Sequence, residues 1–368
     1  MSWSIETIEK DLLLSKIGVL AMAPEAVVSA VNRVERVLGS EWIGSISGKG
    51  IAPAMEAIGM GLRLASIENL GGAEDLITHI RRKDQDAESE LTAIHVIRSQ
   101  NSSAQLELHP AVGTRKADFR ARRVEGEQWT TVEVTKPNTS EEQQRIEGVL
   151  RRIEKVFEKV EYPFSLDIVF RREPSASEIE LLCERLPQFC QLLGQQRAEL
   201  VDGMGFLFLN HVEIGKLQLV EIPELAETPT IGIATFFGGG SDGRAHHQVS
   251  VRIPFSDERA EEILRDEARQ LPKPGVGMVM IDVPASPKEL RGWVSLIERR
   301  FQPAIHTRIS GVCLFSGGMV PVGDRYGWLL QTKLLTNPHA QFQLPSWIQA
   351  AIKSAGEEFD HAASQWKR

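Results

Sequence analysis

The chain has 368 residues, a net charge of −8 and ordinary shares of hydrophobic (42%) and charged (25%) residues. This composition is typical of a globular protein with one large domain or two smaller ones. The acidic balance excludes a general polyanion-binding protein, so a nucleic-acid site would have to be a local basic patch.

Three cysteines are present, and they form no Cys-x-x-Cys pair. We therefore expect neither a disulfide framework nor a zinc knuckle. The first residues lack the cationic start and unbroken apolar run of a secretory signal. No stretch of the sequence reaches the ~18 uncharged apolar residues that span a bilayer. These features predict a cytoplasmic protein without membrane contact, and they leave open whether it forms a homo-oligomer.

Hydrophobic periodicity predicts helices first and then a mixture of helices and strands. Apolar residues at helical spacing predict four N-terminal helices, at 5–20, 24–39, 52–67 and 83–102. A pair of strands follows, then an amphipathic helix after Pro137 and an apolar strand at 164–170. The last third alternates helices with strands, among them the apolar strand "VGMVMIDV" at 276–283. We therefore expect an α/β protein with a mixed β-sheet flanked by helices.

The strand pair, "RKADFRARRV" and "EQWTTVEVTK", carries most of the functional signal. Side chains alternate with period two along a strand, so each of these strands has one apolar and one polar face. A two-residue turn at Glu125-Gly126 would set Arg120 opposite Thr131 and Asp118 opposite Glu133. The two carboxylates would then stand with their Cβ atoms roughly 5 Å apart. A shift of one residue would separate them, and a shift of two would leave them diagonal on one face.

Like charges in this position are destabilising unless a cation lies between them, and Mg²⁺ is commonly held by one or two carboxylates. The alternative interpretation is a solvated hairpin face whose charges have no role. Arg115, Lys116, Arg120, Arg122 and Arg123 form a basic cluster on the same hairpin. This cluster suits phosphate contacts, unless its arginines only pair with nearby Glu125 and Glu127.

The order of elements here resembles that of the PD-(D/E)XK nucleases. It consists of a helix that carries a glutamate, a strand with an aspartate, a strand with a glutamate near a lysine, and then a helix. The resemblance covers residues 88 to about 170 and implies a restriction-endonuclease-like core. It implies Mg²⁺ or Mn²⁺ as cofactor, nucleic acid as partner and phosphodiester hydrolysis as activity. Arg115, Arg120, Arg122 and Arg123 would contact the nucleic acid.

Carried over to this chain, the resemblance makes Asp118 and Glu133 catalytic metal ligands, with Glu90 (or, less favoured, Glu88) as the helix glutamate. The family's lysine should stand at 135, where this chain has Thr135. Lys136 points to the opposite face of a regular strand and would serve only if the strand bulged or twisted there. Lys116 is the rival, because the same register sets it opposite Thr135. The unusual lysine position keeps a catalytically silent relative, acting as a nucleic-acid-binding or protein-interaction module, as the alternative function.

The expected organisation has three parts: an N-terminal helical region, 1–83; the restriction-endonuclease-like core, 84–170; and a C-terminal α/β region, 171–368. The C-terminal region could continue the core sheet. The fourth core strand is either "FSLDIVF" at 164–170 or the strand at 276–283, with 163–270 as an insertion in the second case.

Overall fold

The computed structural model describes the chain except for short internal gaps and the C-terminal ten residues. The described residues are 2–10, 20–47, 51–99, 101–112, 115–137, 141–157, 164–192, 196–200, 203–210, 222–223, 230–237, 247–254, 259–283, 287–322 and 325–358. They form two compact units. Unit 1 comprises Met1–Pro137 and Glu258–Arg368, and unit 2 comprises Asn138–Asp257.

Unit 1 is built on a seven-stranded mixed sheet in the order β1-β4-β5-β11-β12-β13-β14. The parallel strands β5, β11 and β12 lie at its centre, and β1 and β4 extend one side as antiparallel strands. The strands are β1 (Gln105–Leu108), β4 (Phe119–Arg122), β5 (Thr130–Thr135), β11 (Val276–Asp282), β12 (Ile309–Val322), β13 (Arg325–Thr336) and β14 (Glu357–Glu358). The predicted α/β class with a mixed sheet flanked by helices is confirmed.

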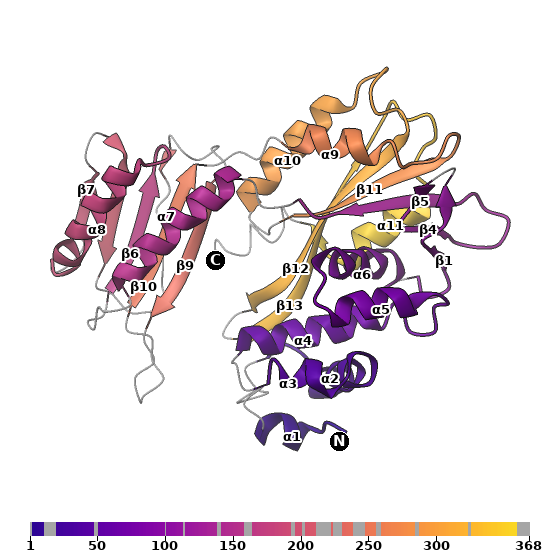
Figure 1. The fold of residues 1–368 in the computed structure, drawn as a ribbon, viewed down its shortest axis with the longest axis horizontal. Coiled ribbons are helices and arrows are strands. Elements are labelled where there is room, and N and C mark those ends of the chain that lie inside the picture. The colour runs from indigo at the N-terminus through magenta and orange to yellow at the C-terminus, as the bar shows by residue number, and fades with distance from the viewer. Residues whose placement is uncertain are drawn as a thin grey trace. The chain divides into compact units, whose positions relative to one another are not determined.

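Helices cover both faces of this sheet (Figure 1). On one face lie α4, α6 and α11, which bury Val132, Met278 and Phe315 in the largest core cluster. On the other face lie α9 and α10, which bury Val279 and Leu314. The helices of unit 1 are α1 (Ile5–Lys10), α2 (Pro24–Leu38), α3 (Ser40–Gly44), α4 (Ile51–Leu64), α5 (Ala73–Arg81), α6 (Gln85–Arg98), α9 (Ala260–Glu267), α10 (Pro287–Arg300) and α11 (Ser346–Ala355).

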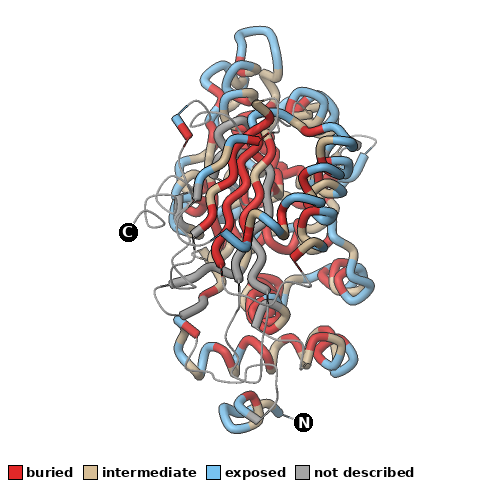
Figure 2. The backbone as a smooth tube through the Cα atoms, turned by 90° about the vertical axis from the view of Figure 1, so that its left-hand side faces the viewer, coloured by how far each residue is buried: buried red, intermediate tan, exposed pale blue. Residues whose placement is uncertain are grey.

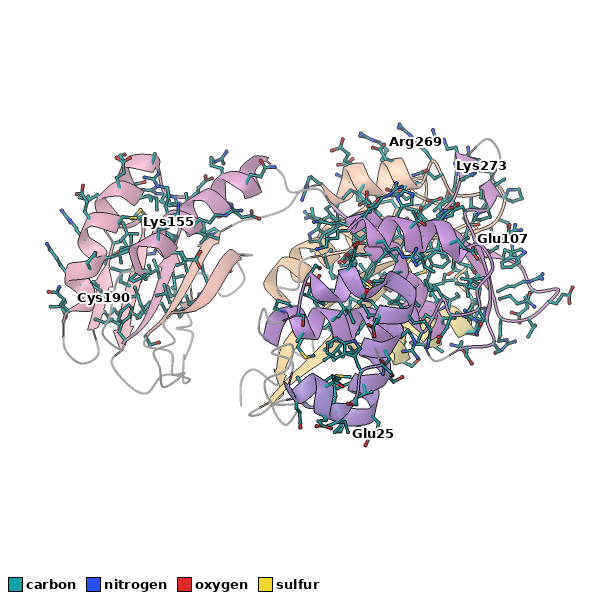
Figure 3. All side chains as sticks on the ribbon, turned by 60° about the horizontal axis from the view of Figure 1, so that its bottom comes forward. Glu25, Glu107, Lys155, Cys190, Arg269 and Lys273 are labelled. Atoms are coloured by element: carbon teal, nitrogen blue, oxygen red, sulfur yellow. The ribbon has the colours of Figure 1, made fainter. Side chains whose placement is uncertain are left out.

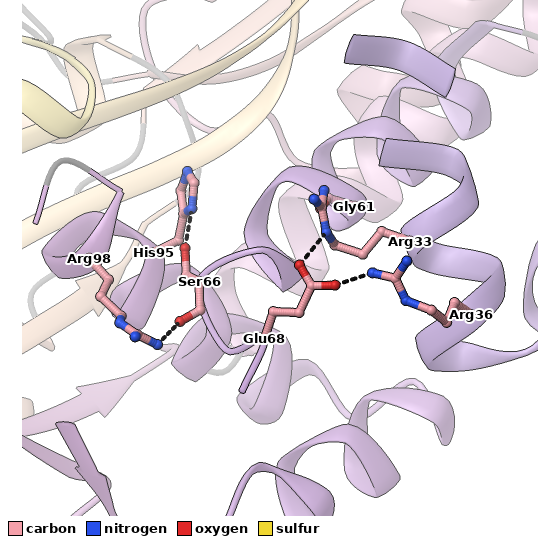
Figure 4. Close-up of polar contacts among 7 residues, drawn as sticks. All are labelled: Arg33, Arg36, Gly61, Ser66, Glu68, His95 and Arg98. Carbon is pink, nitrogen blue, oxygen red and sulfur yellow. Dashed lines mark hydrogen bonds and ion pairs between the residues drawn. The ribbon is translucent and has the colours of Figure 1, made fainter. Parts of the chain in front are cut away.

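Helix α6 lies in the middle of the first of these layers, so it positions side chains over the sheet. Its first residue follows Asp84, whose carboxylate accepts a hydrogen bond from the Asp86 N–H at 3.0 Å and caps the helix. The helix is buried on nearly all sides. Figure 2 shows that buried residues lie along the strands and along one face of many helices. Polar contacts hold it to the turn that follows α4: Ser66 bonds to His95, and Arg98 donates to the Ser66 carbonyl (Figure 4).

Unit 2 is a five-stranded sheet of order β7-β8-β6-β10-β9, with α7 and α8 packed on it. Its buried core runs along β6, where all seven residues are buried. Figure 3 shows its side chains, with Lys155 on α7 and Cys190 at the end of α8. The elements are α7 (Glu141–Phe157), β6 (Phe164–Phe170), α8 (Ala176–Cys190), β7 (Gln196–Glu199), β8 (Gly205–Asn210), β9 (Thr230–Phe237) and β10 (His247–Pro254).

This division differs from the one expected for residues 84–170. The chain leaves unit 1 after β5, forms unit 2, and returns at α9 and β11. The neighbour of β5 is β11, which pairs parallel to it with Val279 beside Glu133. Strand β6, the other candidate, pairs with β8 and β10 in the second sheet. The sheet order therefore agrees with the alternative in which the strand at 276–283 joins the core sheet after an inserted segment. The inserted unit is 138–257.

Sequence reasoning did not predict β13, β14, α5 or α11. The strand expected at 115–124 is split in two: Arg115–Lys116 form β3, which pairs with β2 (Ala111–Val112), and Phe119–Arg122 form β4. No helix among the described residues is long and apolar enough to cross a membrane.

The Trp328 side chain of β13 packs directly against two glycines that have no side chain to obstruct it. A Cβ added at Gly59 of α4 would overlap the Trp328 indole, and one at Gly317 of β12 would lie 2.6 Å from it. The Arg63 guanidinium also lies over the indole, 5.7 Å from its centroid. The missing side chains thus allow α4 to pack closely against the β12–β13 pair.

We expect Gly59→Ala to lower the free energy of unfolding by about 1–3 kcal/mol, the usual cost of overpacking a core. Urea denaturation would measure the loss. Gly44→Ala on α3 is the matched control, because a Cβ there meets nothing within 4 Å. Equal stability of Gly59→Ala and wild type would contradict this packing.

Candidate active site

The predicted register of the hairpin is confirmed. Strands β4 and β5 pair antiparallel, with Arg120 opposite Thr131 and Phe119 opposite Val132. The ladder ends at Phe119, and Asp118 lies one residue beyond it, where its backbone N–H donates a hydrogen bond to the Glu133 carboxylate. The hydrophobic and polar alternation of the two strands was therefore sufficient to place these two acids beside each other.

The β4–β5 ladder stops before Asp118, and the Asp118 side chain makes the next hydrogen bond to β5 in its place. Its Oδ2 accepts a hydrogen bond from the Val134 N–H at 2.6 Å. Its backbone turns instead toward the preceding loop, where the Asp118 carbonyl accepts from the His109 N–H at 2.8 Å. One carboxylate oxygen is thus fixed to β5, which holds Asp118 beside Glu133.

Glu133 is an acid in an almost fully buried strand position, with 2% of its surface exposed. Its strand neighbour Val279 lies in the core cluster under α9 and α10, so Glu133 faces those helices. The Asp118 N–H donates a hydrogen bond to the carboxylate, but Oε1 has no hydrogen-bond partner. Such an unsatisfied buried polar atom is uncommon and calls for a partner, whether a proton, a water or an ion.

Glu90 reaches the same region from α6. It is 8% exposed, its Oε1 is buried without a hydrogen-bond partner, and the Nε2 of His109 lies 3.9 Å from that oxygen. The charge of Asp118 acts on Glu90, so the structure brings the helix glutamate close to Asp118. Glu88, the less favoured choice, acts instead with Arg63, Lys136 and Asp282.

Burial and mutual repulsion raise the pKa values of these carboxyls. Desolvation, followed by the charge of Asp118, raises the pKa of Glu90 to about 8. Desolvation, followed by the charges of Asp118 and Glu267, raises the pKa of Glu133 to about 8. Burial also raises the pKa of Asp118, although the Val134 N–H and His109 oppose the effect. At neutral pH Glu90 and Glu133 therefore hold protons, which a cation would displace.

The two lysines predicted as catalytic do not join these acids. Lys136 lies on the α6 side of the sheet, with its Nζ 3.9 Å from Oδ2 of Asp282, which also accepts from Ser89 at 2.6 Å. This is the opposite-face orientation that strand alternation predicts for position 136.

Lys116 was expected opposite Thr135, and that expectation is wrong. The strand breaks at Ala117–Asp118, so Lys116 belongs to β3, pairs with Ala111 and is exposed. The break follows from the backbone bonds of 117 and 118, which go to residues 109 and 110 rather than to β5.

Three of the four arginines proposed for phosphate contacts have side-chain partners. Arg120 donates to Glu107, which lies on the edge strand β1 (Figure 3), Arg122 donates to Gln105, and Arg123 pairs with Glu127. Arg120 and Arg122 also lie over the Trp129 ring at 4.6 and 4.4 Å from its centroid. Arg115 is exposed, and its charge lowers the pKa of Glu133, which places it on the carboxylate side.

Two acids near the site were missed by sequence reasoning, Glu267 and Asp282. Glu267 ends α9 and accepts a hydrogen bond from the Gln270 side chain at 2.9 Å. Asp282 ends the apolar strand β11, and an acid at the carboxyl end of a central parallel strand is a recognisable signal. Glu267 has no such signal, because nothing in the helix sequence "AEEILRDE" distinguishes it from its acidic neighbours.

The donor chemistry fits a magnesium ion, which needs only one or two carboxylates and keeps several waters. Asp118 and Glu133 provide that pair, and the orphaned Oε1 of Glu133 provides a ligand atom. Among the residues that the structure describes, no group of three or more His, Cys, Asp or Glu side chains is arranged to hold a metal ion. The observed arrangement thus corresponds at most to a two-carboxylate site.

Comparisons with known proteins add no assignment. No protein-family model, no curated protein and no solved structure matches the chain.

The raised pKa values predict that stability falls as the pH rises. Protonated Glu90 and Glu133 stabilise the fold fully below their ordinary pKa of 4.5, and this contribution is lost as the pH rises through about 8. Urea denaturation without divalent cations, at intervals from pH 5 to pH 9, should show this decline. We expect it to be weaker in Glu133→Gln, because an amide stays neutral throughout. A stability difference between variant and wild type that does not change with pH would refute the assignment.

Proposed function

We propose that the chain is a nuclease-like protein that uses a divalent cation to hydrolyse phosphodiester bonds in nucleic acid. The observation that carries the proposal is the Asp118–Glu133 pair: a half-buried acid just before β4 and a buried acid on β5, the latter with an unpartnered carboxylate oxygen. Their place beside the central strands, with a helix glutamate next to them, is what the resemblance to the PD-(D/E)XK nucleases leads one to expect.

Each residue has a definite part in this proposal. Asp118 and Glu133 hold the cation, and the Val134 N–H fixes the orientation of Asp118. Glu90 binds a water of the cation or stays protonated beside it. A bound Mg²⁺ would polarise a phosphoryl oxygen and lower the pKa of its water. Arg115 and the Arg120–Trp129–Arg122 stack would contact the phosphate backbone.

The second candidate is a catalytically silent relative that binds nucleic acid or protein. It is favoured by Thr135 at the lysine position and by Lys136, which pairs with Asp282 on the other side of the sheet. No lysine among the described residues pairs with Asp118, Glu133 or Glu90 in the structure. A silent relative would retain the acids as a cation or proton site without turnover.

Cation binding is the first prediction of the proposal. Melting in the presence of Mn²⁺ or Mg²⁺ should raise the unfolding temperature of the wild type, since a ligand at 100 times its Kd adds about 2.7 kcal/mol to the native state. Asp118→Asn should abolish the gain. Asp75→Asn makes the same chemical change at an exposed position of α5 and should retain it. Absence of any cation-dependent shift in the wild type would contradict the proposal.

Turnover separates the two candidates. The wild type should cleave single- or double-stranded DNA or RNA in Mn²⁺, and Glu133→Gln should not. Glu125→Gln, in the exposed hairpin turn, is the matched control. Cation binding without cleavage of any of the four substrates would support the silent relative instead.

A further inference from the structure

His109 lies beside both of the acids, Asp118 and Glu90, that the structure brings close together. It follows β1 directly, and its backbone N–H donates to the Asp118 carbonyl at 2.8 Å, one residue beyond the last β1–β4 pair, Leu108 with Phe119. Its ring Nε2 lies 3.9 Å from Oε1 of Glu90. The backbone of His109 is thus bonded to the residue that carries one acid, while its ring lies next to the other acid.

The backbone conformation of His109 is unusual. Its φ of 48° falls in the left-handed region, which few non-glycine residues adopt. The carbonyl of the next residue, Pro110, accepts a hydrogen bond from the Ala117 N–H at 3.1 Å, so two consecutive loop residues are bonded to the segment that leads into β4. A conformation of this kind persists where the surrounding structure enforces it, and it is frequent at functional sites. The loop therefore holds His109 at a defined place beside Asp118.

The imidazole of His109 is accessible and has hydrogen-bonding capacity to spare. The side chain is 37% exposed, and the 3.9 Å between Nε2 and Glu90 is longer than a hydrogen bond. Within the part of the chain that the structure describes, no residue is hydrogen-bonded to either ring nitrogen. At least one ring nitrogen carries a proton in both the neutral and the charged form of histidine. The ring can therefore donate a hydrogen bond to a ligand in either form.

A donor is needed here because neither lysine supplies one. Lys136 pairs with Asp282, and Lys116 is exposed on β3. A phosphodiester that approaches Asp118 brings negatively charged oxygens toward carboxylates, which is unfavourable unless a donor faces those oxygens. His109 has the required position, and its charge already acts on Asp118.

We propose that His109 binds the scissile phosphate, by donating its ring N–H to a non-bridging phosphoryl oxygen in the role that the family resemblance gives to the lysine. The inference rests on the proposed function, to which it adds the group that binds the substrate phosphate. The ring keeps its proton throughout: water adds to phosphorus, one ester P–O bond breaks, one proton of the water ends on the leaving hydroxyl and the other passes to solvent. Because His109 is not a cation ligand in this proposal, cation binding and turnover can be measured apart.

The test is His109→Asn, because asparagine tolerates the left-handed backbone conformation and its short side chain lacks the reach of the imidazole. Steady-state cleavage in Mn²⁺ of a labelled oligonucleotide, DNA or RNA as the wild type accepts, should show kcat reduced about 100-fold, the usual effect of removing one such donor. Mn²⁺ affinity, measured by the loss of the free Mn²⁺ signal in electron paramagnetic resonance, should stay that of the wild type. His339→Asn makes the same change in an exposed turn and should retain both quantities.

His109→Lys is the second variant, and it keeps the inference testable if thermal melting shows that His109→Asn does not fold. Its ammonium restores a donor, so we expect it to retain at least a tenth of the wild-type kcat. A folded His109→Lys below that level would overturn the inference, as would wild-type kcat in His109→Asn.

Failure of the proposed function gives a different pattern from failure of the inference. If the wild type cleaves neither DNA nor RNA, the proposed function fails, and the role of His109 fails with it. Cleavage that Glu133→Gln abolishes and His109→Asn leaves intact rejects the role of His109 alone. A parallel loss of Mn²⁺ affinity and kcat in His109→Asn also rejects that role, because the proposal separates the ring from the cation.

Discussion

The candidate site depends on one electrostatic conflict: two carboxylates lie side by side at the end of a mostly buried β-ladder. Asp118 lies one residue beyond the β4–β5 pairing; its N–H donates to the Glu133 carboxylate, and the Val134 N–H fixes its Oδ2. Like charges in this arrangement are unfavourable in a low-dielectric environment, so each must hold a proton, a cation or a hydrogen bond. Burial, followed by the charge of Asp118, raises the pKa of Glu133 to about 8.

The remaining architecture brings further groups to this point from both faces of the sheet. Helix α6 supplies Glu90 from one side, and α9 supplies Glu267 from the other. Helix α9 occupies that place because the chain leaves after β5, forms unit 2, and re-enters beside the strand it left. The insertion therefore leaves the order of the central strands intact while it separates their residues by more than a hundred positions in sequence.

A second polar group lies on the α6 side at the carboxyl ends of β5 and β11. There Asp282 accepts from Ser89 and lies near Lys136. Because Lys136 is next to Thr135 in sequence but on the other face, a shift of one position separates it from the acids that the resemblance pairs with it. The short strand end "EVTK" therefore contributes side chains to both faces of the sheet, one polar group on each.

The sequence predicted the parts of the site that depend on local periodicity. Alternation along the hairpin was enough for the register, and the apolar strand at 276–283 was recognised as a possible fourth core strand. It could not predict the strand break at Asp118, because that break depends on backbone hydrogen bonds to His109 and Pro110. It also could not predict Glu267, whose proximity to Glu133 exists only through the packing of α9 on the sheet. Non-local contacts of this kind leave no periodic signal.

A crystal structure of the full chain soaked with Mn²⁺ tests the central claim most directly, through the anomalous scattering of the metal. The account predicts an anomalous peak within coordination distance, about 2.0–2.3 Å, of carboxylate oxygens from both Asp118 and Glu133. Side chains of these two residues that point apart, with the metal bound elsewhere or not at all, would contradict it.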